Sequence, residues 1–251
     1  MRSYAIGDIH GQFDLLRRAH DLIADDQAHE GGPAAPVIHL GDLVDRGPDS
    51  AKVVAYLGQG TQAGENWITL KGNHDRMLSL FMAETPQPDP VLRPDLSYLH
   101  PRIGGGATLA SYGVANAADR PLAPVHAEAL AAFPDADRAF LASLPVMHQR
   151  GEVVFVHAGL RPGVALKDQI EDDLVWIRDP FLPYRDSFGP LVIHGHTALN
   201  APVHYGNRVN IDSGAAYGGP LTAIVIEGRD VFVLTQAGRI PLPVTPDAAV
   251  R

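Results

Sequence analysis

Apolar runs and amphipathic stretches alternate over the first third of the chain. Residues 3–6 form an apolar run typical of a buried strand, and apolar side chains then recur at helical spacing over 13–23. The same order returns with the runs 37–40 and 67–70 and with the helical patterns after them, 53–57 and 77–81. This alternation predicts parallel strand pairing. In such sheets functional groups gather at the carboxyl ends of the strands.

The pattern breaks between residues 85 and 144. Five prolines between 85 and 101 predict an extended excursion there, because proline fits poorly inside a helix or a strand. Helical spacing returns around 107–112, 125–133 and 135–144. We interpret 85–144 as a helical and proline-rich insertion beside the functional site.

Short runs rich in β-branched residues dominate the rest of the chain. They cover 153–156, 191–193, 202–205, 209–211, 221–226 and 231–234. Glycine, asparagine and aspartate between them suggest hairpins. Two packed mixed sheets flanked by helices, an α/β/β/α sandwich, would accommodate both parts of the chain. At 251 residues we expect one domain over 1–242 and a poorly ordered C-terminal tail over 243–251.

Five short segments combine glycine with aspartate, histidine or asparagine. They are Gly7–Gly11 (GDIHG), Gly41–Gly47 (GDLVDRG), Gly72–Asp75 (GNHD), Val156–Gly159 (VHAG) and Gly195–Thr197 (GHT). All except the third directly follow an apolar run, as expected for ligands at strand ends. Carboxylate, imidazole and amide oxygen suit Mn, Fe or Zn, and the absence of cysteine excludes a thiolate site. The segments therefore predict a divalent metal site and point to hydrolysis.

Composition and charge limit the classes of partner and the cellular location that we expect. A net charge of -9 and a pI near 5.7 argue against broad capture of nucleic acid or of an anionic membrane. The first motif begins at Gly7, which leaves no room for a signal peptide, and no apolar run is long enough to span a membrane. The lack of cysteine weakly favours a reducing compartment. We expect a cytoplasmic protein.

A two-metal hydrolase needs two cations about 3.5–4 Å apart, a shared ligand and an activated water. Asp8 and His10 are two positions apart after the first strand and could face one ion. Asp42, after the next strand, is the natural bridging carboxylate. The remaining candidates, which would complete the second ion, are Asn73, His157 and His196. Turn and capping roles are the alternative for all six, since aspartate and asparagine beside glycine are ordinary in loops.

The five segments together resemble the phosphoprotein phosphatase (PPP) family of metallophosphoesterases, in its bacterial and phage serine/threonine phosphatase branch. That family carries GDxHG, GDxxDRG and GNHE followed by two metal-binding histidines, and the likeness here runs from Gly7 to His196. The resemblance implies a calcineurin-like metallophosphoesterase fold and two divalent ions, Mn by preference with Fe or Zn as alternatives. It implies Asp8, His10 and Asp42 at one ion, and Asp42, Asn73, His157 and His196 at the other.

The resemblance also implies catalytic and substrate-binding roles. His74 matches the general acid of the family and Asp45 its carboxylate partner. Arg46 would bind phosphate oxygens, with Asn73 beside it, and Arg178 in the segment WIR resembles the second phosphate arginine of bacterial members. A structural role for His74 and Asp45, or a surface salt bridge for Arg178, is the alternative. Separately from the resemblance, Tyr217 in a glycine-rich loop is a candidate substrate contact or a packing residue.

The chain departs from the eukaryotic pattern in two places. The third motif ends in Asp75 instead of glutamate, and the segment 210–219 replaces the family's SAPNY. We therefore expect no obligate regulatory subunit. Bacterial diadenosine tetraphosphate hydrolases share GNHD but typically lack the second aspartate of GDxxDRG, so Asp45 favours phosphomonoesters.

The leading hypothesis is a metal-dependent phosphomonoesterase, of the serine/threonine protein phosphatase type. It would hydrolyse a phosphorylated protein or a small phosphoester by direct attack of a hydroxide that bridges the two metals. A diadenosine tetraphosphatase-type nucleotide pyrophosphohydrolase is the second reading. The third is a metallophosphatase fold kept as a non-catalytic binding module.

Three further features are open at this stage. His39 and His194 lie inside apolar runs just before a motif, so we expect both to be buried and hydrogen-bonded, with support of the metal site as the alternative. Gly104–Gly106 follows Arg102 and could wrap an anion or form a flexible turn.

Overall fold

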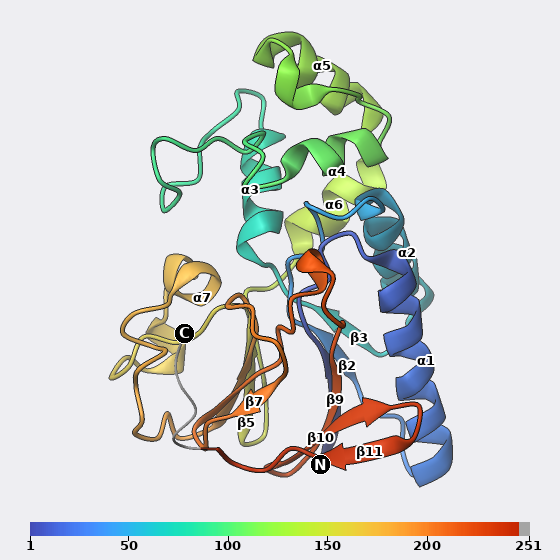
Figure 1. Ribbon diagram of the computed structural model, residues 1–251, viewed down its shortest axis with the longest axis vertical. Helices are drawn as coiled ribbons and strands as arrows, with labels where there is room; N and C mark the ends of the chain where they lie inside the picture. The colour runs from blue at the N-terminus through green and yellow to red at the C-terminus, as the bar shows by residue number, and fades with distance from the viewer. Residues whose placement is uncertain (246–251) are drawn as a thin grey trace.

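The computed structural model describes residues 1–245, and its centre is a pair of packed sheets (Figure 1). The first sheet has the strand order β11-β10-β9-β1-β2-β3. Its strands are β1 (Arg2–Ile6), β2 (Val37–His39), β3 (Trp67–Thr69), β9 (Ala223–Glu227), β10 (Asp230–Thr235) and β11 (Gly238–Pro241). As predicted, β1, β2 and β3 pair in parallel. The later strands add to β1 as an antiparallel meander.

The second sheet has the order β4-β5-β6-β8-β7. Its strands are β4 (Met147–Arg150), β5 (Val153–Val156), β6 (Leu191–His194), β7 (Val203–His204) and β8 (Arg208–Asn210). The hairpins expected throughout this part are wrong for its centre, because β5, β6 and β8 pair in parallel. The long connection from β5 to β6 carries a helix, and such a crossover brings the second strand back in the same direction. Hairpins join only the edge strands β4 and β7 to their neighbours.

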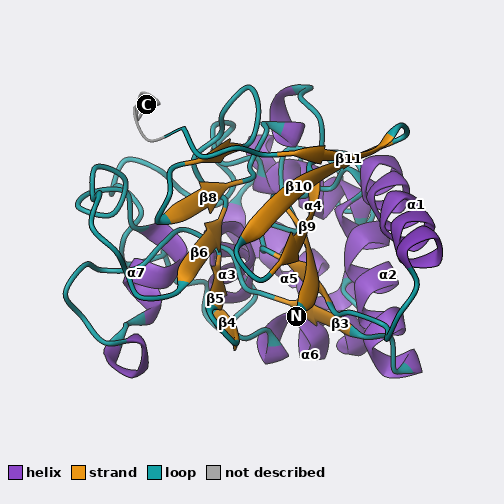
Figure 2. Cartoon of the chain, turned by 90° about the horizontal axis from the view of Figure 1, so that it is seen from below, coloured by secondary structure: helices purple, strands orange, loops and turns teal. Residues whose placement is uncertain are grey.

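Helices cover the outer faces of both sheets. Figures 1 and 2 show α1 (Phe13–Glu30) and α2 (Ser50–Ala63) along the first sheet, and α7 (Glu171–Trp176) beside the second. Strand β1 explains this layering, because successive side chains of a strand point to opposite faces. Tyr4 and Ile6 belong to the core that contains α1 and α2, whereas Ala5 belongs to the core between the sheets. The predicted α/β/β/α sandwich is confirmed.

The segment 85–144 lies above the two sheets in Figure 1. It contains α4 (Gly105–Ser111), a short 3-10 helix (Ala117–Asp119), α5 (Leu122–Ala132) and α6 (Asp135–Ser143). It follows α3 (Asn73–Phe81), and the part up to Ile103 forms neither helix nor strand, as the prolines predict. Helices α4 and α6 pack on α2. The insertion therefore stands at the edge where the strands β1 and β2 end.

The chain end meets the second sheet. Val244 forms a bridge with His204, and the backbone N–H of Thr245 donates to the carbonyl of His204 at 2.7 Å. The rest of the expected tail, 246–251, lies outside the described residues, and the limits of a single domain over 1–242 stay a prediction. Across residues 1–245, no helix combines the length and apolar character that a membrane span requires.

Candidate active site

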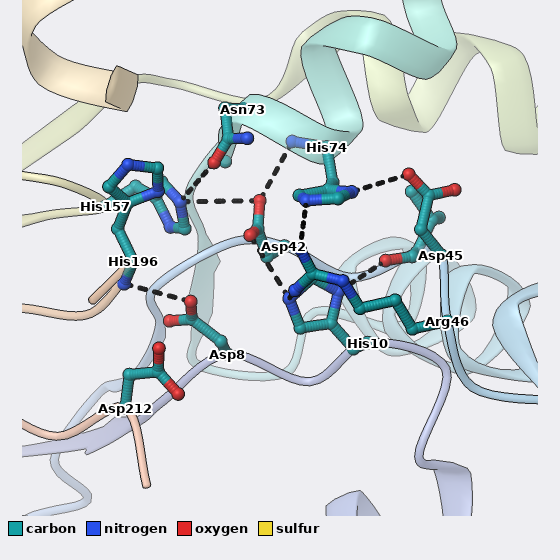
Figure 3. A network of polar contacts seen from close by, with 12 residues as sticks. Asp8, His10, Asp42, Asp45, Arg46, Asn73, His74, His157, His196 and Asp212 are labelled. Atoms are coloured by element: carbon teal, nitrogen blue, oxygen red, sulfur yellow. Dashed lines mark hydrogen bonds and ion pairs between the residues drawn. The ribbon is translucent and has the colours of Figure 1, made fainter. Parts of the chain in front are cut away.

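All five motifs converge at one edge of the two sheets (Figure 3). Asp8 and His10 follow β1, Asp42 follows β2, and His157 and His196 follow β5 and β6. Asn73 and His74 form the first turn of α3. The six expected metal ligands are all buried, and none is more than 9% exposed as a residue. Residues that lie up to 188 positions apart in the sequence thus share one small volume.

Asp42 lies at the centre of two groups of ligand atoms. Its Oδ2 is 3.3 Å from His10 Nε2, and its Oδ1 is 3.4 Å from His157 Nε2. Within 4.8 Å of one another lie the ligand atoms of His10, Asp42 and His74, and likewise those of Asp42, His157 and His196. Burial opposes ionisation of Asp42, but the surrounding histidines, His157 foremost, hold its pKa well below the ordinary value. An ionised carboxylate shared by two groups is what a bridging ligand requires.

Two histidines, His10 and His157, each turn one ring nitrogen away from Asp42. His10 Nδ1 donates to the carbonyl of Val44 and His157 Nδ1 to that of Leu40, each at 2.9 Å. This contact selects the tautomer whose Nε2 lone pair faces the centre of the site. Burial also lowers the pKa of His157. Ring nitrogens aimed in this way are suited to bind a cation.

Among the expected metal ligands, two buried polar atoms have no hydrogen-bond partner in the described residues: Asp8 Oδ1 and His196 Nε2. Burial, and then the charges of Asp212 and Asp42, raise the pKa of Asp8 well above its ordinary value. A cation would satisfy both orphaned atoms and compensate the clustered carboxylates. The donor set thus fits divalent metal ions. Asp212, which follows β8 and lines the same cavity, is absent from the sequence-based candidates.

Glycine makes the close approach of these carboxylates to the backbone feasible. A Cβ at Gly195 would lie 1.9 Å from Asp8 Oδ1, and one at Gly72 would lie 2.2 Å from Asp42 Oδ1. Both distances are far inside van der Waals contact. The glycines of the GNHD and GHT motifs are therefore steric requirements of the metal-type ligands beside them.

The backbone itself is strained around the site. Only six non-glycine residues within 1–245 have positive φ, and all but Asn116 belong to the motifs. They are His10 (46°), Asp42 (48°), Asp45 (73°), Arg46 (68°) and His196 (65°). The left-handed region is costly for residues with a Cβ, so surrounding contacts must hold these turns in place. Strain concentrated in this way is typical of functional sites.

Asp75, the departure from the eukaryotic motif, holds two loops together. Its carboxylate accepts the backbone N–H of Gly72 at 2.8 Å and that of Leu43 at 2.9 Å. Leu43 belongs to the GDLVDRG loop and Gly72 to the GNHD loop. The shorter aspartate side chain thus fixes Asp42 relative to Asn73.

His74 forms a dyad with Asp45. Its Nδ1 lies 2.6 Å from Asp45 Oδ2, and the carboxylate is completely buried. The other oxygen, Oδ1, accepts hydrogen bonds from Tyr98 Oη at 2.8 Å and from Thr108 Oγ1 at 2.7 Å. A carboxylate held in this way stabilises a protonated imidazole. Tyr98 and Thr108 come from the insertion, and the sequence analysis missed both, since no pattern marks them.

Arg46 connects the dyad to the metal-type cluster. Its guanidinium donates to His10 Nε2 at 2.8 Å and to His74 Nε2 at 3.1 Å, and it lies 5.1 Å from the centre of the Tyr217 ring. Gly104 packs directly on Arg46, where a Cβ would lie 2.8 Å from its backbone nitrogen. The glycine run, for which an anion site and a flexible turn were both open, thus leaves space for Arg46.

The remaining candidates line the cavity. Its volume is about 460 Å³, and Arg178 and Tyr217 lie at its wall together with Arg93 from the insertion. Arg178 donates to the carbonyl of His196 at 3.4 Å and forms no ion pair with any residue of 1–245, so the surface salt bridge considered for it is not found. Tyr217 is 69% exposed, which argues against a packing role.

His39 and His194 are buried and hydrogen-bonded, as expected. His39 contacts Thr69 Oγ1 at 3.1 Å and His20 Nε2 at 3.0 Å, away from the motifs. His194 Nε2 lies 3.1 Å from an Arg208 Nη1, and its Nδ1 lies 3.1 Å from the carbonyl of Gly195. Of these two side chains, only His194 therefore contacts a motif, at the backbone carbonyl of Gly195 in GHT.

The geometry matches what comparison with known proteins finds. The family model of the calcineurin-like phosphoesterases matches residues 1–225. The chain belongs to this family. The resemblance inferred from the motifs is thereby confirmed, and members of the family use a dinuclear divalent metal site.

The relatives divide between two kinds of substrate. Serine/threonine-protein phosphatase 1 of Salmonella typhimurium is 28% identical over 89% of this chain and 91% of its own. The asymmetrical bis(5′-nucleosyl)-tetraphosphatase PrpE of Anoxybacillus flavithermus is 24% identical over 87% of this chain and 88% of its own. A solved structure, the cold-active protein-tyrosine phosphatase of a psychrophilic Shewanella species, has a TM-score of 0.61 at 16% identity and covers 96% of this chain and 80% of its own. That last likeness concerns the fold alone.

Proposed function

We propose that this phosphoesterase is a metal-dependent phosphomonoesterase that removes phosphate from phosphoserine and phosphothreonine. The observation that carries the proposal is the buried His74–Asp45 dyad at the edge of the metal-type cluster. A serine or threonine leaving group departs as a basic alkoxide and needs a proton. A phosphoanhydride releases a far less basic anion and has little need of such an acid.

The ligands divide around Asp42. Asp8 and His10 would join Asp42 at one ion, and Asn73, His157 and His196 would join it at the other, with Mn the preferred metal and Fe or Zn as alternatives. When bound, such ions neutralise phosphate oxygens and lower the pKa of a bound water toward neutrality.

Arg46 links substrate binding to acid catalysis. Its two terminal nitrogens donate to His10 and His74. Phosphate oxygens are stronger acceptors for a bidentate guanidinium, so an arriving phosphate would draw Arg46 off both rings. His74 Nε2 is then free to carry a proton, which Asp45 stabilises from the other side of the ring. Arg178, Asn73 and Tyr217 complete the substrate contacts from the cavity wall.

In the reaction His74 transfers its Nε2 proton to the oxygen that leaves phosphorus. Arg46 offsets the negative charge that accumulates on the phosphoryl oxygens in the transition state. The side chains of the insertion limit access of bulk water to the dyad, because Tyr98 and Thr108 occupy the outer face of Asp45.

A nucleotide pyrophosphohydrolase is the second candidate. Its support is the likeness to the Anoxybacillus flavithermus tetraphosphatase. The rates of the Mn-loaded enzyme on a phosphopeptide and on diadenosine tetraphosphate separate the two. Faster turnover of the dinucleotide by a factor of ten or more would replace the phosphomonoesterase proposal. The intact dyad and ligand set speak against a non-catalytic binding module.

The decisive experiment is His74→Asn. The variant should bind both metals but lose roughly 10² to 10⁴-fold in kcat on alkyl phosphates, the usual worth of general acid catalysis. Turnover of p-nitrophenyl phosphate should fall less, because its phenolate leaves without a proton. The exposed His29→Asn is the control and should match the wild type on both substrates.

Two results would remove His74 from the acid role. One is an equal loss on alkyl and aryl phosphates, which would mean that its effect does not depend on the leaving group. The other is loss of metal from the variant, measured by elemental analysis, which would make His74 a ligand.

A further inference from the structure

A second depression adjoins the catalytic cavity on the side of the insertion. It has a volume of about 750 Å³, and we call it the Arg102 groove after the residue at its outer part. The catalytic cavity and the groove share Arg46, Ala216 and Tyr217 in their linings. The groove therefore begins beside the residue that would bind the phosphate.

The charge of the groove is opposite to that of the chain. The sequence contains 29 acidic and 20 basic residues, yet the lining of the groove includes Arg46 and Arg102 and no aspartate or glutamate. A positive groove on an acidic protein attracts negative groups locally. It thus suits a ligand that carries negative charge beyond the phosphate at the metal-type cluster.

Arg102 is free to bind such a group. Its side chain is exposed, and its guanidinium has no hydrogen bond or ion pair with any residue of 1–245. Other arginines of the chain are already bound to carboxylates, among them Arg76, Arg93, Arg120, Arg138, Arg161 and Arg239. Asp95 pairs with Arg93 at 2.7 Å, and that hydrogen bond, ahead of the charge of Arg102, lowers the pKa of Asp95.

The rest of the lining suits an extended backbone. Gly104, Gly106, Ala107, Ala118 and Ala216 give it small side chains, and Tyr217 offers an exposed ring at the junction with the cavity. A nucleobase would need polar side chains to read its edges, and the groove has none besides its two arginines and the Tyr217 hydroxyl. A peptide needs only room for its main chain and one partner for a charged side chain.

We propose that the Arg102 groove binds the residues that flank a phosphoserine or phosphothreonine, and that Arg102 pairs with an acidic side chain among them. This inference rests on the proposed function and names its substrate class: phosphopeptides with a nearby aspartate or glutamate. Arg46 serves the phosphate and Arg102 the flanking carboxylate.

The test uses two phosphopeptides that differ only in glutamate or glutamine beside the phosphorylated residue. The wild-type enzyme should prefer the acidic peptide in kcat/KM. Arg102→Ala should lower kcat/KM on the acidic peptide by roughly 3- to 10-fold, the range for a partly exposed charged pair. The loss should lie in KM, because the groove does not touch the reacting atoms. Rates on the neutral peptide and on p-nitrophenyl phosphate should stay unchanged.

Two further variants sharpen the test. Arg138→Ala removes a half-buried arginine of the same insertion that pairs with Asp135, and should leave the preference unchanged. Arg102→Glu should reverse it, favouring a peptide with lysine at the flanking position. A reversal of this kind cannot come from general loss of stability.

Four results would overturn the inference. A wild-type enzyme that cleaves both peptides equally, or an Arg102→Ala variant that loses equally on both, would leave the groove without a selective role. An effect of Arg102→Ala confined to diadenosine tetraphosphate would make it a nucleotide site. An enzyme that cleaves p-nitrophenyl phosphate but neither peptide would overturn the proposed function as well, and this separates the two failures.

Discussion

His157 and His74 lie on opposite sides of Asp42, and their Nδ1 atoms meet different partners. His157 Nδ1 donates to a backbone carbonyl, that of Leu40, and burial lowers its pKa. His74 Nδ1 faces the carboxylate of Asp45 at 2.6 Å. A carbonyl partner favours a neutral ring with a lone pair for a cation, whereas a carboxylate favours a ring that carries a proton. Two identical side chains near one aspartate are thus prepared for different chemistry.

The two sides also differ in where their support comes from. The surroundings of His157 are the ends of β2 and β5, in the middle of the two packed sheets. The dyad of His74 is closed by Tyr98 and Thr108, which belong to the insertion. The common framework of the fold therefore carries the metal-type ligands, and the insertion contributes to the acid. The experiments below test this division, from the largest expected effect to the smallest.

Removal of metal should affect both sides together and is expected to abolish activity. Chelation with EDTA followed by desalting should eliminate phosphatase turnover, and added Mn should restore it. The reason is that Asp8 Oδ1 and His196 Nε2 are buried without a hydrogen-bond partner in residues 1–245, and that Asp8, Asp42 and Asp212 cluster where a cation would offset their charge. Full activity in protein shown to be metal-free would refute the two-metal reading.

Asp42→Asn should lose metal and activity together, since Asp42 is the carboxylate in contact range of both ligand groups. Mutation of a residue that only hydrogen-bonds to a metal ligand typically lowers metal affinity or activity by roughly 10- to 100-fold. Loss of the ligand itself should therefore lower activity by more than ~10²-fold. Circular dichroism should show that the fold is retained. If the variant bound two ions at wild-type affinity, Asp42 could not be the bridge.

Asp45→Asn should affect only the acid side. The amide keeps the shape of the carboxylate but no longer stabilises a protonated His74, so kcat on alkyl phosphates should fall by roughly 10²-fold or more. Metal content should equal that of the wild type, in contrast to Asp42→Asn. Loss of metal in this variant would mean that the two sides are not separable.

Tyr98→Phe should have a smaller effect of the same kind. It removes one of the two side-chain donors to Asp45 Oδ1, worth about tenfold in kcat if one charged hydrogen bond of ~1.4 kcal/mol is lost. The loss should grow with the pKa of the leaving group. Tyr112→Phe is a matched control, because Tyr112 Oη donates to Asp137 at 2.9 Å in the same insertion. Equal losses in the two variants would reduce Tyr98 to general packing.

The ligand set could be predicted from the sequence because its signals are local. Each ligand lies within a few residues of a glycine, and most follow an apolar run that must end at a sheet edge. The first three strand–helix units could be predicted for the same reason. They place Asp8, Asp42 and Asn73 at neighbouring positions. Local spacing of apolar and polar residues was sufficient to predict this part of the fold.

Only the tertiary structure decided the surroundings of Asp45 and the pairing of the second sheet. Tyr98 and Thr108 are 53 and 63 positions from Asp45, so nothing local indicates either contact. Asp212 reaches the site only because β8 pairs in parallel with β6. Short runs of β-branched residues are equally compatible with hairpins, so the sequence did not indicate this pairing. Residue type and nearby spacing determine which side chains can bind a metal. Long-range packing determines which histidine meets a carboxylate, and so which one is prepared to act as an acid.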